Sequence, residues 1–390
     1  ISGLHITLWA WLVALVVRLV WGRLPVWAPG WGSRVLLACP APVAAAWGGC
    51  LLALAYAVFS GWGVPAQRTV LMLAVVVALR TSGRHWPWPL TMALALAVVL
   101  AWEPWAWLQA GFWLSFVAVG VLLAQSDAPH QGGTVLVRHR PILAHGKGAL
   151  SRLRAASSTL ASAEWLKRLK YEAALLGSTQ WVMTLSLAPL TLLLFGQVSV
   201  VGFLANLVAI PVVTLVVTPL ALAGVVWPGF WLASAEVLSW CMRGLVWLAE
   251  WPWASLAWPA VPWGWGVLAV CGGVVLAMPW PVRVRLAGAA CLLPALLWTP
   301  PRPLAGEFEL LAADVGQGSA VLIRTASGSV LYDAGPQWSL HADAGQRVLR
   351  PLLQALGERP SHVVLSHRDG DHVGGALGVL QGLPQAQVWA

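Results

Sequence analysis

Four side chains that could bind a metal ion lie close together near the end of the 390-residue chain: His367, Asp369, Asp371 and His372. They follow an apolar run, residues 362–365, that predicts a buried strand. Imidazole and carboxylate ligands suit Zn²⁺ or Mn²⁺, and the lack of a nearby Cys argues against a purely structural zinc site. Because a strand holds the following loop still, that loop aims its side chains at one point. The stretch predicts a site for one or two divalent cations. The alternative is a charged, solvated turn that happens to hold two His.

The segment before these residues has the pattern of short strands separated by glycine turns. Strands are predicted at 307–313, 320–324 and 329–332, and a helix at 346–356 leads to the strand before His367. Asp314 and Asp333 stand at strand ends, where each could orient a metal ligand from behind or simply cap a turn. Residues 305–390 are therefore predicted to form a partial α/β domain that carries the metal site.

The rest of the chain has the composition of an integral membrane protein. Its hydrophobic fraction is 59%, only 9% of its residues are charged, and a soluble domain carries about 25% charged residues. About ten helical spans are predicted, at 1–21, 40–59, 69–80, 88–103, 108–125, 177–196, 199–226, 232–250, 262–280 and 284–299. The fold class is thus a polytopic α-helical membrane protein, with residues 1–299 as the helix bundle.

The placement of Lys and Arg predicts the orientation of the bundle. Residues 126–172 are polar and basic, which favours a cytoplasmic loop, although contact with anionic lipid headgroups or with nucleic acid is also open. Alternating spans then place residues 23–34, 80–85 and 283–285 in the cytoplasm and everything after residue 300 outside it. Arg68 and Arg302 are the exceptions to this charge rule. The net charge of +9 does not by itself imply a nucleic acid partner, because a membrane protein distributes its cations by topology.

The ends of the sequence suggest an internal fragment. The chain begins with Ile1, already inside an apolar segment, and ends 18 residues after His372. We therefore expect the complete protein to be a metal-dependent hydrolase and the fragment to be inactive.

The string from His367 to His372 resembles the HxHxDH signature of metallo-β-lactamase-fold hydrolases, in an HxDxDH form. The resemblance implies that His367 and Asp369 hold a first metal and that Asp371 and His372 hold a second. Asp369 stands where the commoner pattern has His, which makes the first site richer in oxygen and favours Mn²⁺ relative to Zn²⁺.

Further motifs extend the resemblance over most of the chain. Residues 1–6, 67–72, 111–116 and 205–211, and the DVGQG and YDAG turns before the HxDxDH string, resemble the competence domain and attached metallo-β-lactamase-like domain of the ComEC family. Trp113 and Ser319 depart from the family's usual Gln and Asp. The resemblance implies an inner-membrane channel that takes up single-stranded DNA in natural transformation, with an attached metal-dependent nuclease-like domain. Membrane lipids, other competence proteins and further copies of the chain are the partners that it leaves open.

A DNA path would need polar side chains at membrane depth, and Asn206, Arg68 and Gln109 are the candidates. Asn206, followed by Pro211 and Pro219, suggests a broken helix that faces the bundle interior or a water-filled path; an interhelical hydrogen bond is the alternative. In the soluble domain Asp371 is the predicted catalytic position, as ligand and as charge balance for the cation. Two other classes stay open, namely a membrane-anchored hydrolase acting on a lipid or small ester, and a secondary transporter.

Overall fold

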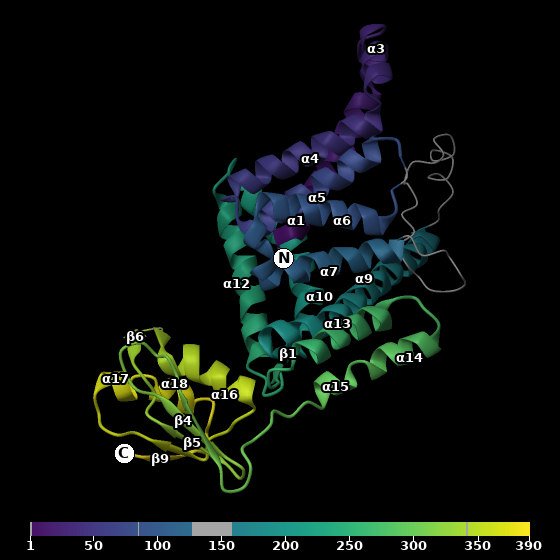
Figure 1. The fold of residues 1–390 in the computed structure, drawn as a ribbon. Helices are drawn as coiled ribbons and strands as arrows, with labels where there is room; N and C mark the ends of the chain where they lie inside the picture. Colours follow the sequence, from purple (N-terminus) through teal and green to yellow (C-terminus); the bar gives the residue numbers. More distant parts are fainter. Residues whose placement is uncertain (1, 85, 127–157, 341) are drawn as a thin grey trace. The chain divides into compact units, whose positions relative to one another are not determined.

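The computed structural model describes residues 2–84, 86–126, 158–340 and 342–390. The chain divides into two compact units. The first contains Ile1–Leu187, Val200–Ala254 and Ala277–Pro281, and the second contains Ala188–Ser199, Ser255–Leu276 and Val282–Ala390. Figure 1 shows the first unit as helices and the second as helices followed by a sheet domain.

The described part of the first unit is built mainly from apolar helices. Its helices are α1 (Ser2–Gly22), α2 (Leu24–Trp27), α3 (Trp31–Ala38), α4 (Ala41–Phe59), α5 (Val64–Thr81), α6 (Trp88–Trp102), the 3₁₀ helix η1 (Pro104–Leu108), α7 (Ala110–Ser126), α9 (Ser158–Phe195, which continues into the second unit), α10 (Gly202–Val212), the π-helical turn η2 (Val213–Val217), α11 (Thr218–Ala223) and α12 (Gly229–Ala249). Small residues let the helices approach closely, since a Cβ at Gly49 in α4 would lie 2.5 Å from the Ala10 carbonyl oxygen in α1.

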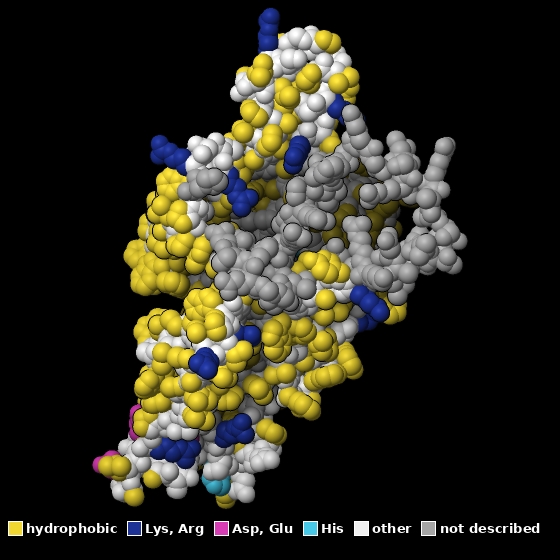
Figure 2. Space-filling view, turned by 90° about the vertical axis from the view of Figure 1, so that its right-hand side faces the viewer, with side chains coloured by type: hydrophobic (Ala, Val, Ile, Leu, Met, Phe, Trp, Pro, Cys, Tyr) yellow, Lys and Arg dark blue, Asp and Glu magenta, His cyan; other side chains and the backbone are white. Residues whose placement is uncertain are grey.

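Among the described residues, six helical segments are long and apolar enough to cross a membrane: His5–Trp27, Ala41–Phe59, Val64–Thr81, Ala174–Phe195, Gly202–Ala223 and Gly229–Ala249. Three shorter apolar helices occupy Trp88–Trp102, Ala110–Gln125 and Trp263–Ala277. On the face shown in Figure 2, hydrophobic side chains cover most of the described helical surface and Lys and Arg are few. That surface matches a lipid environment rather than water.

Two predicted features take a different form. In place of a single span at 284–299 the chain forms α14 (Val282–Ala290) and α15 (Leu293–Leu296), since Pro294 ends the regular pattern. Where a broken helix was predicted after Asn206, the chain forms the π-helical turn η2. This turn joins α10 directly to α11, so the helix is irregular there but continuous. Of the predicted basic loop 126–172, residues 127–157 lie outside the described residues and the part from Ser158 onward is helical.

The second unit begins with a small ribbon. Strand β1 (Gln197–Ser199) follows α9 and pairs antiparallel with β2 (Ser255–Ala257). Helix α13 (Trp263–Ala277) then leads away from the ribbon, and α14 with α15 runs back along it. A Cβ at Gly272 of α13 would lie 2.5 Å from the Gly288 carbonyl oxygen of α14, so these helices touch through their backbones.

The sheet domain has five strands in the order β3-β4-β5-β8-β9. They are β3 (Phe308–Ala312), β4 (Val321–Thr325), β5 (Ser329–Tyr332), β8 (His362–Val364) and β9 (Gln387–Trp389). Strand β4 pairs antiparallel with both β3 and β5, and β8 pairs parallel with both β5 and β9. Between β5 and β8 the chain forms a small antiparallel pair, β6 (Gln337–Ser339) and β7 (Ala342–Asp343), then the π-helical turn η3 (Gly345–Leu349) and helix α16 (Arg350–Leu356). Two short helices, α17 (Gly370–Val373) and α18 (Ala376–Leu380), lie between β8 and β9. Buried Leu, Val and Ala side chains of β4, β5 and β8 pack against η3, α16 and α18 to form its core.

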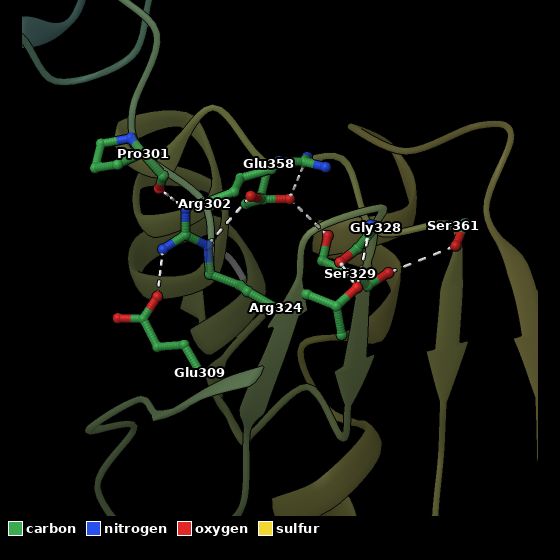
Figure 3. A network of polar contacts seen from close by, with 9 residues as sticks. Pro301, Arg302, Glu309, Arg324, Gly328, Ser329, Glu358 and Ser361 are labelled. Atoms are coloured by element: carbon green, nitrogen blue, oxygen red, sulfur yellow. Dashed lines mark hydrogen bonds and ion pairs between the residues drawn. The ribbon is translucent and has the colours of Figure 1, made fainter. Parts of the chain in front are cut away.

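A buried polar network ties the start of this domain to its sheet (Figure 3). Arg324 of β4 donates from Nε to Glu358 Oε1 at 3.1 Å and from Nη2 to the Pro301 carbonyl oxygen at 3.0 Å, and it also pairs with Glu309. Glu358 Oε2 accepts from Arg302 at 2.9 Å and from the Ser329 hydroxyl at 2.8 Å. Because the buried charges are paired and hydrogen-bonded, the network fixes the segment that enters the sheet domain.

Candidate metal centre

The loop with the four predicted ligands lies where the parallel strand β8 ends. It is pinned to two neighbouring turns by backbone hydrogen bonds. The Ala334 amide donates to the His372 carbonyl oxygen at 2.7 Å, and the Ser319 amide donates to the Asp371 carbonyl oxygen at 3.2 Å. Gly318, with φ of 143°, allows this approach, since a Cβ there would overlap the Asp371 carbonyl oxygen. The DVGQG and YDAG turns therefore hold the ligand loop in place.

Asp333 is the polar centre of this arrangement. Its side chain is fully buried, and its backbone has φ of 60°, which is uncommon for a residue other than Gly. Its Oδ1 accepts from the Ser366 amide at 2.8 Å, and its Oδ2 contacts the Ser366 hydroxyl at 3.0 Å and His372 Nδ1 at 2.7 Å. Since Nδ1 of His372 donates to Asp333, the ring presents Nε2 as its other nitrogen, as metal-binding histidines do.

The hydrogen bonds change the acidity of both partners. Burial alone would raise the pKa of Asp333, but the hydrogen bonds from His372 and from the Ser366 amide and hydroxyl outweigh it, so the pKa lies below its usual value. The hydrogen bond to Asp333 raises the pKa of His372 against the opposing effect of burial, and the nearby Asp371 and Asp369 carboxylates add to the rise. Both shifts favour the charged forms of the two groups, so they favour an ion pair between the Asp333 carboxylate and a protonated His372.

The remaining predicted ligands lie beside this pair. The rings of His367 and His372 have centroids 4.0 Å apart, His367 Nε2 lies 3.4 Å from Asp369 Oδ2, and His372 Nε2 lies 3.9 Å from Asp371 Oδ2. Among the residues that the structure describes, however, no three His, Cys, Asp or Glu side chains are grouped so that they could hold a metal ion. The four side chains thus form two His–Asp pairs and do not converge on one point. Their donor types fit a divalent cation, whose other coordination positions the described residues leave to further groups or water.

The two predicted supporting carboxylates differ in what they bind. Asp314 caps its own turn, where its Oδ1 accepts from the Gly316 amide at 3.1 Å, while Asp333 holds His372. The sequence reasoning missed Ser366, whose hydroxyl oxygen contacts Asp333, His367 Nδ1 at 2.9 Å and His372 Nδ1 at 3.4 Å. A hydroxyl residue directly before the first His, opposite an Asp at the end of a parallel strand, is the signal that could have found it.

A second polar cluster lies among the helices of the first unit. Arg68 of α5 is 5% exposed and donates from Nη1 to Gln109 Oε1 at 3.4 Å, and Gln109 Nε2 donates to Glu103 Oε1 at 2.9 Å. The structure thus brings together two of the three predicted channel residues and adds Glu103, which the sequence suggested only as part of a turn. The third, Asn206, is exposed on α10 and is not enclosed by the described helices.

Comparison with known proteins assigns both parts of the chain. The sequence model of the family described as Competence protein matches residues 1–284. The chain belongs to this competence family. The model described as Metallo-beta-lactamase superfamily matches residues 313–389, which contain the five-stranded sheet from β4 onward and the candidate metal loop.

Relatives of this competence-family chain match along nearly its whole length. Competence protein ComA of Neisseria gonorrhoeae is 33% identical over 100% of this chain and 49% of its own length. The uncharacterized protein YcaI of Escherichia coli is 31% identical over 97% of this chain and 46% of its own length, and Recombination protein 2 of Haemophilus influenzae is 26% identical over 87% and 44%. The chain thus spans about half the length of the curated relatives that it matches. No solved structure matches it.

The Asp333–His372 pair predicts a pH dependence of stability. With metal removed by a chelator, the pair stabilises the fold fully above the ordinary pKa of Asp, about 4, and below that of His, about 6.5. Stability is lost as pH falls through the lowered pKa of Asp333 and as pH rises through the raised pKa of His372. We expect the melting temperature of the sheet domain to decline on both sides of this window. Asp333→Asn keeps a side chain that tolerates positive φ and should flatten both declines.

The matched control is Asp314→Asn, which changes an exposed turn cap in the same domain. It should keep the wild-type profile. Parallel profiles for the wild type and Asp333→Asn would show that the pair does not contribute as described.

Proposed function

We propose that this protein moves single-stranded DNA across the bacterial inner membrane in natural transformation, and that its sheet domain is a metal-dependent nuclease. The observation that carries the proposal is the competence-family match over residues 1–284, which contain the bundle of apolar helices. The names of two relatives, Competence protein ComA and Recombination protein 2, support a role in handling DNA.

The buried cluster of Arg68, Gln109 and Glu103 supports a polar path through the helices. An ionisable side chain inside a membrane bundle is costly and marks a substrate path more often than a structural contact. Arg68 Nε is buried with no hydrogen-bond partner among the described residues, so the cation is not fully satisfied by the protein. A passing phosphate would supply the missing acceptor.

The loop after β8 supports the nuclease. His367, Asp369, Asp371 and His372 are the residues that would hold one or two divalent cations, Zn²⁺ or Mn²⁺. Such a cation, when bound, would polarise a phosphodiester and lower the pKa of a water molecule. Asp333 fixes which ring nitrogen His372 would present to a metal. The hydrogen bonds from the Ala334 and Ser319 amides hold the backbone of the loop in position.

The connectivity of the second unit supports an extracytoplasmic sheet domain. Trp258, which follows β2, donates from Nε1 to the Leu296 carbonyl oxygen at the end of α15, at 3.1 Å. The pair of α13 and α14–α15 therefore leads out from the ribbon and back to it, and the sheet domain begins on the ribbon's side of the membrane. If the basic segment before α9 is cytoplasmic, α9 crosses once and the ribbon is outside. Arg302 and Arg68 are the two cations that this orientation places outside the cytoplasm, and both have partners. Arg302 pairs with Glu358, and Arg68 contacts Gln109, which is bonded to Glu103.

Cysteine labelling tests the orientation. In a background without the five native Cys, single Cys residues are placed at positions 150 and 340, the latter occupied by a Leu that is 89% exposed. An impermeant maleimide should label position 340 in intact spheroplasts and position 150 only after lysis. The reverse pattern would place the sheet domain in the cytoplasm.

Asp371→Asn tests the metal and nuclease part. The amide keeps the size of the side chain but removes the charge that helps to hold a cation. Changing a residue that only supports a ligand costs about 10–100-fold in affinity or activity, so changing a ligand should cost at least as much. The measurements are bound Zn²⁺ and Mn²⁺ by mass spectrometry and cleavage of single-stranded DNA, in the complete protein. Asp314→Asn is the control. Full metal content and unchanged cleavage in Asp371→Asn would remove the nuclease part, and hydrolysis of a lipid or ester without DNA cleavage would favour the anchored hydrolase.

Uptake into proteoliposomes tests the transport part. A membrane potential that is positive inside drives anions inward by about 2.3 kcal/mol per charge per 100 mV. A fluorescent single strand should become protected from an external nuclease, while the duplex of the same sequence should not. Arg68→Gln should lower the protected fraction about tenfold, since it removes the buried cation of the path. Arg34→Gln, in the exposed part of α3, should leave it unchanged. Equal protection of the strand and the duplex, or none above protein-free liposomes, would contradict the channel.

A further inference from the structure

The second unit contains a cleft of about 320 Å³ that lies apart from the metal loop. One wall is the segment after β2, with Trp258 and Pro259, and the other is α16 with the residues that follow it and α18. The polar and aromatic side chains of its lining are Trp258, Arg350, Gln354, Glu358 and Arg359.

The two walls are joined by hydrogen bonds, so the cleft has a defined shape. Gln354 of α16 donates from Nε2 to the Gly196 carbonyl oxygen at 2.7 Å, and the Ala260 amide donates to the Ala355 carbonyl oxygen at 2.8 Å. The indole of Trp258 is held from its edge, since Nε1 donates to Leu296. These contacts make the cleft a fixed feature of the second unit.

The cleft is positively charged. Neither Arg350 nor Arg359 has a carboxylate within ion-pair distance among the described residues, and both are exposed. Glu358 is the only acid in the lining, and its side chain is 1% exposed with both oxygens bound to Arg324, Arg302 and Ser329 (Figure 3). Its charge is therefore neutralised inside the protein, and the two guanidinium groups remain for an anion.

We propose that this cleft binds single-stranded nucleic acid, with Arg350 and Arg359 on the phosphates and a base against Trp258. The inference rests on the proposed function and names a holding site for its substrate. A volume near 300 Å³ is at the low end for a small-molecule pocket and suits about one nucleotide. Backbone phosphates with bases stacked on aromatic rings are the general mode of single-strand binding. A duplex hides its base faces, and a lipid headgroup offers an anion but no ring to match Trp258.

The cleft and the candidate metal loop lie at different places in the sheet domain. Glu358 and Arg359 precede β8, and the metal loop follows β8, so the cleft and the loop lie at opposite ends of the same parallel strands. Single-stranded nucleic acid bound in the cleft would be held beside the β1–β2 ribbon, where the helices of the second unit begin. The cleft would thus hold the strand at the membrane side of the sheet domain.

The test measures binding of a fluorescein-labelled oligothymidylate of about 12 nucleotides, a length within the range of known single-strand sites. The 390-residue chain is held in nanodiscs of neutral phosphatidylcholine, without divalent metal, and affinity is read by anisotropy over a range of salt concentrations. Each phosphate contact to a single strand contributes about 0.7 to the slope of log affinity against log salt. The double variant Arg350→Gln/Arg359→Gln should therefore lower the slope by about 1.4 and weaken binding at least tenfold at low salt.

Two controls separate the cleft from general charge and from misfolding. Arg347→Gln removes an exposed cation one turn before Arg350, outside the cleft lining, and should keep the wild-type slope. Arg350→Lys/Arg359→Lys keeps both charges and should restore most of the slope. A shared melting temperature shows that each variant is folded.

The outcomes are distinct. If the wild type binds and the double variant binds equally well, the cleft is not the site and the proposed function stands. If the wild type does not bind the oligonucleotide at all, both proposals fail. The same variant is also compared with the wild type in anionic nanodiscs that contain phosphatidylglycerol. If it loses affinity for this lipid while its affinity for the oligonucleotide is unchanged, the cleft binds a lipid headgroup and the inference is overturned.

Discussion

The buried carboxylate of Asp333 is the constraint on which the candidate site depends. It lies at the end of β5, faces the loop after the neighbouring parallel strand β8, and has no exposure to water. A buried charge must be hydrogen-bonded, and here its partners are Ser366, the first residue of the loop after β8, and His372, the last of the four predicted ligands. One carboxylate therefore closes the loop between them and sets its width.

Much of this could be predicted from the sequence because strand ends carry their own signals. The apolar run before His367 and the glycine turns around Asp314 and Asp333 gave the strands to within a residue or two, and the parallel pairing of β5 with β8 follows from the helix between them. What the sequence does not encode locally is which strand-end Asp faces His372. Asp314 and Asp333 have the same sequence context, because each follows a strand and precedes a glycine turn. Only the order of strands in the sheet places Asp333 beside the loop after β8, while Asp314 caps its own turn.

The helical part shows the same division. Apolar segments specify where helices are, since length and hydropathy suffice for that. They specify the partners of polar residues poorly, because Arg68 in α5 meets Glu103 and Gln109, which flank η1 more than thirty residues further along the chain. Their meeting depends on the antiparallel packing of α5, α6 and α7, whose contact residues are small or apolar and carry no positional code of their own. Asn206 illustrates the converse, because a polar residue in an apolar span suggests burial, yet the helix face on which it stands is exposed.

The geometry of the sheet domain also bears on the kind of substrate. The His–Asp loop and the arginine cleft are separated by the length of β8, which at three residues is about 10 Å, plus the turns at either end. A small ester bound at the loop could not also contact Arg350 and Arg359. A polymer with a charge at every repeat could engage both ends at once, and each added contact would convert a weak local affinity into a larger one, because the second binding event is then intramolecular. If the loop and the cleft both bind as proposed, two sites at opposite ends of one sheet suit the proposed polyanionic substrate better than the small substrate of an anchored hydrolase.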